Sequence, residues 1–177
     1  RMRMLTSATA FANCDGFTAD YGADYSVQIV PAKAGLARPG TPSYKRWHEV
    51  CLKHLDGRAP KYGALWMTYY PGLMLEWYPN VLVISHLIPR SATRTTNVVE
   101  FYFPEEIALF DRDFVEAERK AYLETAAEDE IICDRMTEGR RALYLQGVNE
   151  VGPYQSPMED GMRHFHEFVQ RELSQHL

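Results

Sequence analysis

The segment from Glu124 to Leu143, ETAAEDEIICDRMTEGRRAL, contains a cluster of acids whose carboxylates could bind a metal ion. On a helical wheel at about 100° per residue, Ile132, Cys133 and Met136 all fall within roughly a quarter turn of Asp129. The acids that follow Asp129 fall on the flank or on the opposite side. The pattern therefore predicts that Asp129 is centred on the apolar stripe of its helix and points into the protein.

An inward carboxylate must be paired, protonated or bound to a metal, because an isolated buried charge is prohibitively costly. Two interpretations stay open on the residues alone. Asp129 could ligate a metal, or it could form a structural ion pair, for which Arg140 projects near the same face. If the helix is continuous, Tyr122, Thr125 and Cys133 flank Asp129 on the same side, where they either line a pocket or simply pack.

Other groups of metal-binding residues have less suitable spacing. His164 and His166 are two residues apart, so on a helix their side chains diverge by about 200° and cannot share one ion. Glu76, His86 and Glu100 are polar residues within apolar strands. They could meet on one face of a sheet as a metal or acid–base site, or form a satisfied polar pair.

Composition limits the classes of function. The chain has 177 residues, enough to bury a hydrophobic core as a single domain over residues 1–177. A net charge of −5 without a basic block argues against a nucleic-acid partner. Three cysteines without a CxxC spacing favour a reducing cytoplasm over a disulfide framework. No apolar run reaches the ~20 residues that cross a membrane.

Short runs of β-branched and aromatic residues predict an antiparallel sheet in the middle of the chain. The links between these runs are too short for parallel crossovers. Both faces of the last run are apolar, so we expect both faces of the sheet to be covered. The predicted strands are YSVQIVPA (25–32), GALWMTYY (63–70), LMLEWY (73–78), VLVISHLI (81–88) and TTNVVEFYF (95–103).

Helical patterns flank the predicted sheet. Residues 43–55 have apolar residues on one face, and a stripe at helical spacing runs from Ile107 through Phe110 and Phe114 to Ala121. Near the end of the chain, Ser156 as N-cap with Glu159 three residues later predicts a helix that begins with a capping box. The fold class that we expect is α+β, a twisted antiparallel sheet gripped by long C-terminal helices.

Three segments together resemble the C-terminal catalytic domain of Rieske-type ring-hydroxylating oxygenase α subunits, which has the helix-grip (Bet v 1-like) architecture. The resemblance covers the chain from about Tyr25 to Val169. It is most specific in the second and third segments. The segments are LMLEWYPNVLVISHLIPRSATRTTNVVEFYFPEEI, EDEIICDRMTEGRRAL and VGPYQSPMEDGMRHFHEFV.

The resemblance implies a mononuclear non-haem Fe(II) held by two histidines and one carboxylate, with open positions for O₂. The position that matches the carboxylate is Asp129. Electrons would pass from NAD(P)H through a reductase or ferredoxin to a Rieske [2Fe-2S] cluster and then to the iron. The substrate would be a small organic molecule, commonly aromatic, in an apolar pocket. The family also implies a homo-oligomer, a trimer.

The chain departs from the family pattern in two motifs. The iron histidines of the family form an H-x4-H segment, and the Rieske cluster needs C-x-H and C-x2-H motifs. Neither is present, so we expect them upstream of Arg1. We therefore expect a fragment, incomplete at its N-terminus, that alone neither holds iron tightly nor turns over. The alternative is a non-enzymatic helix-grip module that binds an apolar small molecule, because the fold alone does not separate the two functions.

Overall fold

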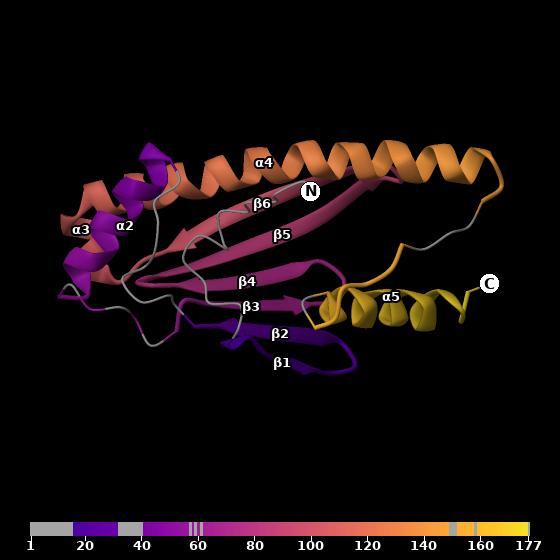
Figure 1. Cartoon of the computed structure of the whole chain (residues 1–177), viewed down its shortest axis with the longest axis horizontal. Helices are drawn as coiled ribbons and strands as arrows, with labels where there is room; N and C mark the ends of the chain where they lie inside the picture. The colour runs from indigo at the N-terminus through magenta and orange to yellow at the C-terminus, as the bar shows by residue number, and fades with distance from the viewer. Residues whose placement is uncertain are drawn as a thin grey trace.

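The computed structural model describes most of the chain as one sheet with helices on one of its faces (Figure 1). Six strands pair antiparallel in the order of the sequence. The strands are β1 (Thr18–Tyr21), β2 (Tyr25–Val30), β3 (Ala64–Tyr69), β4 (Leu73–Tyr78), β5 (Val81–Ser91) and β6 (Arg94–Tyr102). The described residues are 16–31, 41–56, 58, 60, 62–148, 152–157 and 159–176.

Four described helices accompany the sheet. They are α2 (Pro42–His54), α3 (Glu105–Phe110), α4 (Arg112–Leu145) and α5 (Asp160–Leu173). The 34 residues of α4 make a rod of about 51 Å, which runs along the whole molecule in Figure 1. None of the described helices combines the length and the hydropathy needed to cross a bilayer.

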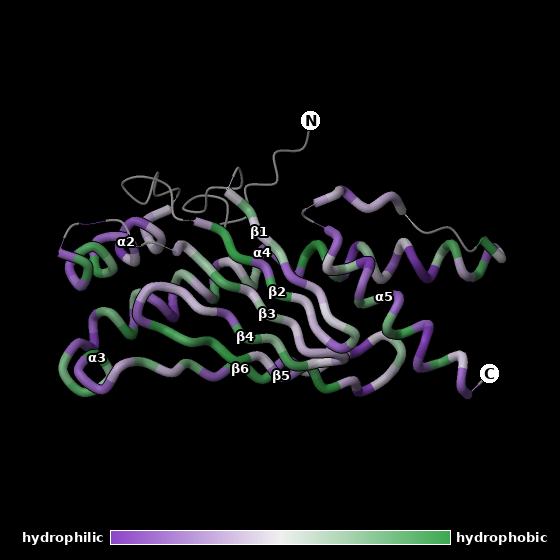
Figure 2. Tube along the Cα trace, turned by 90° about the horizontal axis from the view of Figure 1, so that it is seen from below, coloured by the Kyte–Doolittle hydropathy of each residue, from purple (hydrophilic) through white to green (hydrophobic). Residues whose placement is uncertain are grey.

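The five predicted strands and the α+β fold class are confirmed, and β1 is an addition. The short polar run of β1 is exposed at the edge of the sheet, where no apolar alternation is needed. Hydrophobic stretches run through the central strands (Figure 2).

The sheet has an inner face that contacts the helices. Its central row consists of one residue from each of β2 to β6, paired in turn across the strands: Gln28, Trp66, Glu76, Val83 and Phe101. Paired residues share a face. Phe101 meets the ring of Tyr122 on α4 at 5.2 Å between centroids, which identifies this row as the side that α4 covers.

The main hydrophobic core lies at one end of the inner face, under α2 and the first half of α4. Trp47 and Cys51 of α2 pack there with Val30 of β2 and Phe114 of α4, all buried. The core therefore anchors the first turns of α4 against the sheet and leaves its second half to extend beyond this contact.

The outer face of the sheet lacks the cover that we predicted, at least from the described residues. The side chains of Trp77, Val98 and Tyr102 on this face are 44%, 43% and 50% exposed. The described helices α2, α4 and α5 all contact inner-face residues instead. The prediction that both faces are covered is therefore wrong within this part of the chain.

Two predicted helix boundaries are also wrong. The stripe that begins at Ile107 breaks at Asp111, whose carboxylate accepts a hydrogen bond from the backbone N–H of Phe114 at 3.0 Å and so begins a new helix. As a result Phe110 is 84% exposed. The last helix begins at Asp160 rather than after Ser156, and the hydroxyl of Ser156 donates to the carboxylate of Asp160 at 3.0 Å.

Candidate functional site

Asp129 lies on the side of α4 that faces the sheet. Tyr122 and Asp129 are seven residues apart, close to two full turns, so they project from the same side of the helix. Tyr122 points at the inner face, where its hydroxyl lies 3.4 Å from that of Ser85 on β5. The direction that the helical wheel predicted for Asp129 therefore agrees with the packing of its neighbour.

The burial that we predicted for Asp129 is wrong in degree. The residue is exposed, whereas Glu118, three turns earlier on the same side, is 3% exposed. The buried residues of α4 end at Ala121, so the helix carries Asp129 past its packed half. A helical wheel predicts only the direction in which a side chain points. The side chain is buried only if another element packs against the helix at that position.

The carboxyl of Asp129 has no charged partner in the described part of the chain. Partial burial alone raises its pKa, and neither an ion pair nor a hydrogen bond acts on it. The predicted alternative of an ion pair with Arg140 is therefore not formed. The negative charge of Asp129 reaches Tyr122, where burial first and the charges of Glu76 and Asp129 further raise the pKa to about 12.

A chain of hydrogen bonds crosses the inner face below Asp129. Tyr122 donates to Glu76 at 3.0 Å, and Tyr78 donates to the other oxygen of the same carboxylate at 2.5 Å. The indole N–H of Trp66 donates to the hydroxyl of Tyr78 at 3.0 Å. Three aromatic side chains from β3, β4 and α4 therefore gather around one interior glutamate.

A second glutamate, Glu118, lies in the core between α4 and α2. The indole N–H of Trp47 donates a hydrogen bond to its carboxylate. Burial raises the pKa of Glu118 to about 7, the bond from Trp47 lowers it, and the charge of Glu76 raises it. Its side chain therefore takes up a proton near neutral pH.

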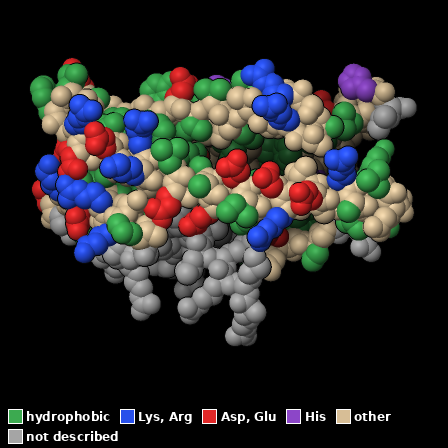
Figure 3. Space-filling view, turned by 90° about the horizontal axis from the view of Figure 1, so that it is seen from above, with side chains coloured by type: hydrophobic (Ala, Val, Ile, Leu, Met, Phe, Trp, Pro, Cys, Tyr) green, Lys and Arg blue, Asp and Glu red, His purple; other side chains and the backbone are tan. Residues whose placement is uncertain are grey.

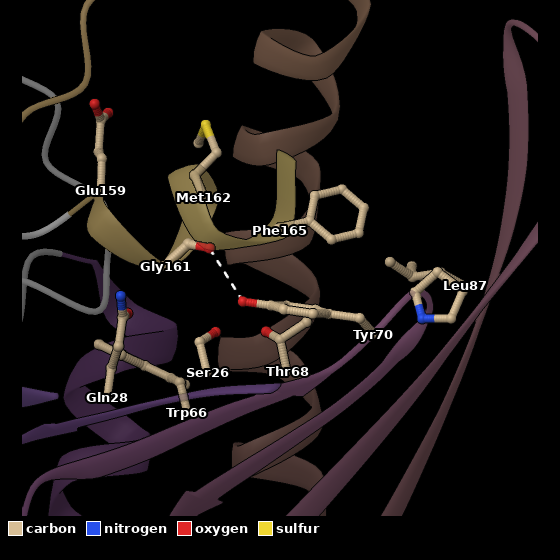
Figure 4. Close-up of a pocket in the computed structure, with 11 residues that line it drawn as sticks. Ser26, Gln28, Trp66, Thr68, Tyr70, Leu87, Glu159, Gly161, Met162 and Phe165 are labelled. Atoms are coloured by element: carbon tan, nitrogen blue, oxygen red, sulfur yellow. Dashed lines mark hydrogen bonds between the residues drawn. The ribbon is translucent and has the colours of Figure 1, made fainter. Parts of the chain in front are cut away.

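A cavity of about 340 Å³ lies on the same face, between the sheet and the start of α5 (Figure 4). Ser26, Gln28 and Thr68 point from the strands toward α5 and form a polar floor. The remaining walls are mostly aromatic and apolar: Trp66, Tyr70, Pro71, Leu87, Met162 and Phe165, with Glu159 and Gly161.

Helix α5 closes the cavity through a glycine. The hydroxyl of Tyr70 donates to the backbone carbonyl of Gly161 at 3.3 Å. A Cβ at position 161 would come within 3.1 Å of the amide nitrogen of Gln28 and 3.3 Å of the hydroxyl of Ser26. The absent side chain therefore lets α5 approach β2 closely enough to form one wall.

Tyr122, Thr125 and Cys133, the three residues that we expected to line a pocket, do not line this cavity. Thr125 is turned toward α2, where its hydroxyl meets that of Tyr44 and donates to the carbonyl of Ala121 at 3.2 Å. Cys133 is exposed. Only Tyr122 reaches the interior, and it does so through Glu76.

The other metal-ligand candidates that the sequence offers lie apart in space. His86 and Glu100 lie 3.7 Å apart on the outer face, whereas Glu76 is on the inner face, so the three cannot form one site. His164 stacks on Tyr21 and His166 bonds to Tyr154, so the two histidines have separate roles. Within the described ranges, no three histidine, cysteine or acidic side chains cluster as metal ligands.

Asp129 fits as one metal ligand, because it offers a carboxylate that nothing else in the described residues occupies. The described cysteines do not fit a [2Fe-2S] cluster, since Cys51 is buried on α2 and Cys133 is exposed on α4.

Seen from above, a hollow lined by hydrophobic side chains opens beside a row of acidic ones (Figure 3). Glu76, Asp129 and several aromatic rings thus lie on the same side of the sheet as the cavity.

Residues 6–175 match the model of the family described as ring hydroxylating alpha subunit (catalytic domain). The chain belongs to this family. A putrescine 2-hydroxylase of Ralstonia nicotianae is 59% identical over 161 residues, and one of Bordetella bronchiseptica is 53% identical over 165. A chloroplastic choline monooxygenase of Atriplex hortensis is 26% identical over 103 residues.

The chain matches only part of each of these relatives. The matched stretches are 91%, 93% and 58% of this chain, in the same order. They span 44%, 38% and 22% of the length of the relatives. Membership of the ring-hydroxylating family agrees with the resemblance that the sequence carries and with the observed sheet and C-terminal helices.

Sequence reasoning missed the roles of Glu76 and Glu118. Glu118 lies eleven residues before Asp129, about three turns, so the same wheel places it on the inward side of the helix. The position of Glu118 next to the buried Ala117 and Ala121 is the signal that predicts its burial. Glu76 accepts from Tyr78 on its own strand and from Tyr122 on α4. No spacing in the sequence predicts that α4 brings Tyr122 over Glu76.

Proposed function

We propose that this chain is the C-terminal part of the catalytic domain of a Rieske non-haem iron oxygenase that hydroxylates a small organic substrate. The observation that carries the proposal is Asp129, a carboxylate on the sheet-facing side of α4 that has no partner among the described residues, in a chain of the ring-hydroxylating family. Its position in the EDEIICDRM segment matches the carboxylate ligand of the family.

Asp129 would hold the iron together with two histidines from elsewhere in the whole protein. When bound, ferrous iron supplies the capacity to activate dioxygen. The electrons would come from NAD(P)H through a reductase or ferredoxin and a Rieske [2Fe-2S] cluster outside the described residues. We also expect a trimer, as the family implies.

The residues of the inner face would place the substrate and keep water away from it. The rings of Trp66, Tyr78 and Tyr122 are locked by hydrogen bonds to one another or to Glu76, so their positions are set before a ligand arrives. The cavity next to Trp66 offers space on the same face. Tyr122 connects the two regions, because it contacts Glu76 and feels the charge of Asp129.

The substrate that we favour is a small aliphatic amine rather than an aromatic hydrocarbon. Two relatives are named for putrescine and one for choline, and both compounds are organic cations near neutral pH. An inner face with Glu76 and Asp129 suits a cation, because their carboxylates make the electrostatic potential at that face more negative.

Replacement of the proposed ligand tests the function. In the intact oxygenase, Asp129→Ala should lose iron and hydroxylation of putrescine together, because one of three protein ligands is removed. The matched control is Asp134→Ala, an exposed aspartate on another side of the same helix. Iron per protomer is measured by elemental analysis and product by mass spectrometry. Full iron and turnover in Asp129→Ala would refute the ligand assignment.

A further inference from the structure

Glu76 occupies the middle of the inner face. It is paired with Trp66 on β3 and with Val83 on β5, and Tyr122 of α4 lies over it. Residues paired across strands have neighbouring side chains. Trp66 also lines the cavity, so Glu76, on the next strand, is separated from the cavity by Trp66.

The charge of Glu76 is not balanced by a cation of the described chain. Its two oxygens accept hydrogen bonds from the hydroxyls of Tyr78 and Tyr122, and no arginine or lysine of the described residues forms an ion pair with it. A carboxylate has about four positions for hydrogen-bond donors, and the two phenols occupy two. The remaining positions can accept N–H groups of a ligand.

The surroundings of Glu76 also suit a cation. Tyr78 and Tyr122 hold their rings next to the carboxylate through their hydroxyls, and Trp66 lies beside Glu76 as its cross-strand neighbour. Aromatic rings attract an ammonium group that reaches one of their faces. Asp129 adds negative charge on the same side, since its charge acts on Tyr122, the residue that lies over Glu76. A positive ligand group beside Glu76 would therefore meet a carboxylate, aromatic rings and the negative charge of Asp129.

Glu159, the acid at the rim of the cavity, is a weaker candidate for this role. Its carboxylate accepts the backbone N–H of Gln155 at 2.7 Å. In Figure 4 its side chain points away from the strands that form the floor. The cavity floor itself is formed by hydroxyl and amide groups, so it carries no charge of its own.

We propose that Glu76 is the residue that binds the ammonium group of the substrate, with Trp66, Tyr78 and Tyr122 as the aromatic walls around that group. The proposal rests on the proposed function, since it assigns the substrate-binding residue of the same site. Glu76 then selects amines over neutral compounds of equal size. Its two phenol donors hold the carboxylate in place before the amine arrives.

Equilibrium binding to the intact, iron-free oxygenase tests the proposal without turnover. Titration calorimetry compares putrescine with 1,4-butanediol, which has the same chain length and no charge. We expect the wild-type protein to prefer the diamine. Glu76→Gln should weaken putrescine binding by at least about tenfold and leave the diol unchanged. Glu76→Asp keeps the charge and should lose less.

The matched control is Glu100→Gln, which removes an exposed carboxylate on the opposite face of the sheet. It should bind putrescine like the wild-type protein. Unchanged putrescine binding in a folded Glu76→Gln protein overturns the assignment of Glu76 while the proposed function stands. A wild-type protein that binds neither putrescine nor another small amine overturns the amine substrate as well.

A second measurement covers the case in which Glu76→Gln does not fold. With fluorotryptophan incorporated, Trp66 gives a ¹⁹F resonance, assigned with Trp66→Phe. Saturating putrescine should shift this resonance in the wild-type protein, because the ammonium group would lie beside the indole ring. The diol should not shift it. A resonance that does not respond to bound putrescine places the ammonium elsewhere and overturns the proposal.

Discussion

Two acids of α4 differ in burial and in the groups that they contact. Glu118 is buried without a cationic partner and accepts a hydrogen bond from Trp47, whereas Asp129 is exposed and has no hydrogen-bonded or charged partner in the described residues. The carboxylate that is free to bind a ligand lies where the packing ends. The buried one is a structural group that titrates near neutral pH.

The raised pKa of Glu118 makes stability depend on pH. Between its ordinary pKa of 4.5 and about 7, the folded chain keeps the proton that the unfolded chain loses. This contribution is therefore fully present below about 4.5 and is lost as the pH rises toward 7. We expect the free energy of unfolding to fall by up to about 3 kcal/mol over this range because of Glu118.

Urea unfolding at about pH 5 and about pH 8 measures this effect. Glu118→Gln should flatten the pH dependence, because a neutral amide still accepts the hydrogen bond from Trp47 and does not titrate. Glu116→Gln, a change at an exposed position on the same helix, serves as the control and should leave the dependence as in the unaltered chain. Equal pH dependence with and without Glu118 would contradict the assignment.

At the scale of elements, α4 is positioned from its first residue. Asp111 accepts the backbone N–H of Phe114 and pairs with Lys53 at 2.8 Å and His54 at 2.9 Å on α2. These contacts lower the pKa of Asp111 well below its usual range, with the bond from Lys53 as the largest cause. The direction of a rod of about 51 Å thus depends on a contact at one end.

Asp111→Ala should destabilise the chain by about 1 to 2 kcal/mol, because it removes the N-cap of α4 and both contacts to α2. The matched control is Asp113→Ala, which removes only an exposed pair with Arg46 and should cost less than about 1 kcal/mol. Chemical unfolding monitored by circular dichroism compares the two. A smaller loss for Asp111→Ala than for Asp113→Ala would disprove the anchoring role.

On the scale of the whole molecule, the sheet is asymmetric. Its inner face contacts α2, α4 and α5, while its outer face exposes several large apolar side chains that no described helix covers. Large apolar side chains that are exposed together on one face of a sheet promote association. We therefore expect the 177-residue chain by itself to bind hydrophobic dyes and to self-associate.

Charges on the outer face should suppress this behaviour. Trp77→Lys combined with Val98→Lys should lower dye fluorescence and the mass seen by light scattering, because both residues lie within the exposed patch. Leu109→Lys, at an exposed position on α3 rather than on the outer face of the sheet, should change neither. Equal association of the double variant and the Leu109→Lys control would show that the patch is not responsible.

The sequence by itself determined the strands, the helical character of the second half and the direction in which Asp129 projects, because these follow from local periodicity. Only the tertiary structure decided which carboxylates are buried and which groups meet. Glu76, Tyr78, Trp66 and Tyr122 come from three elements, and their contacts depend on strand register and on how α4 crosses the sheet. How far Asp129 is buried likewise depends on where the packed part of α4 ends, and the sequence of one helix does not determine that point.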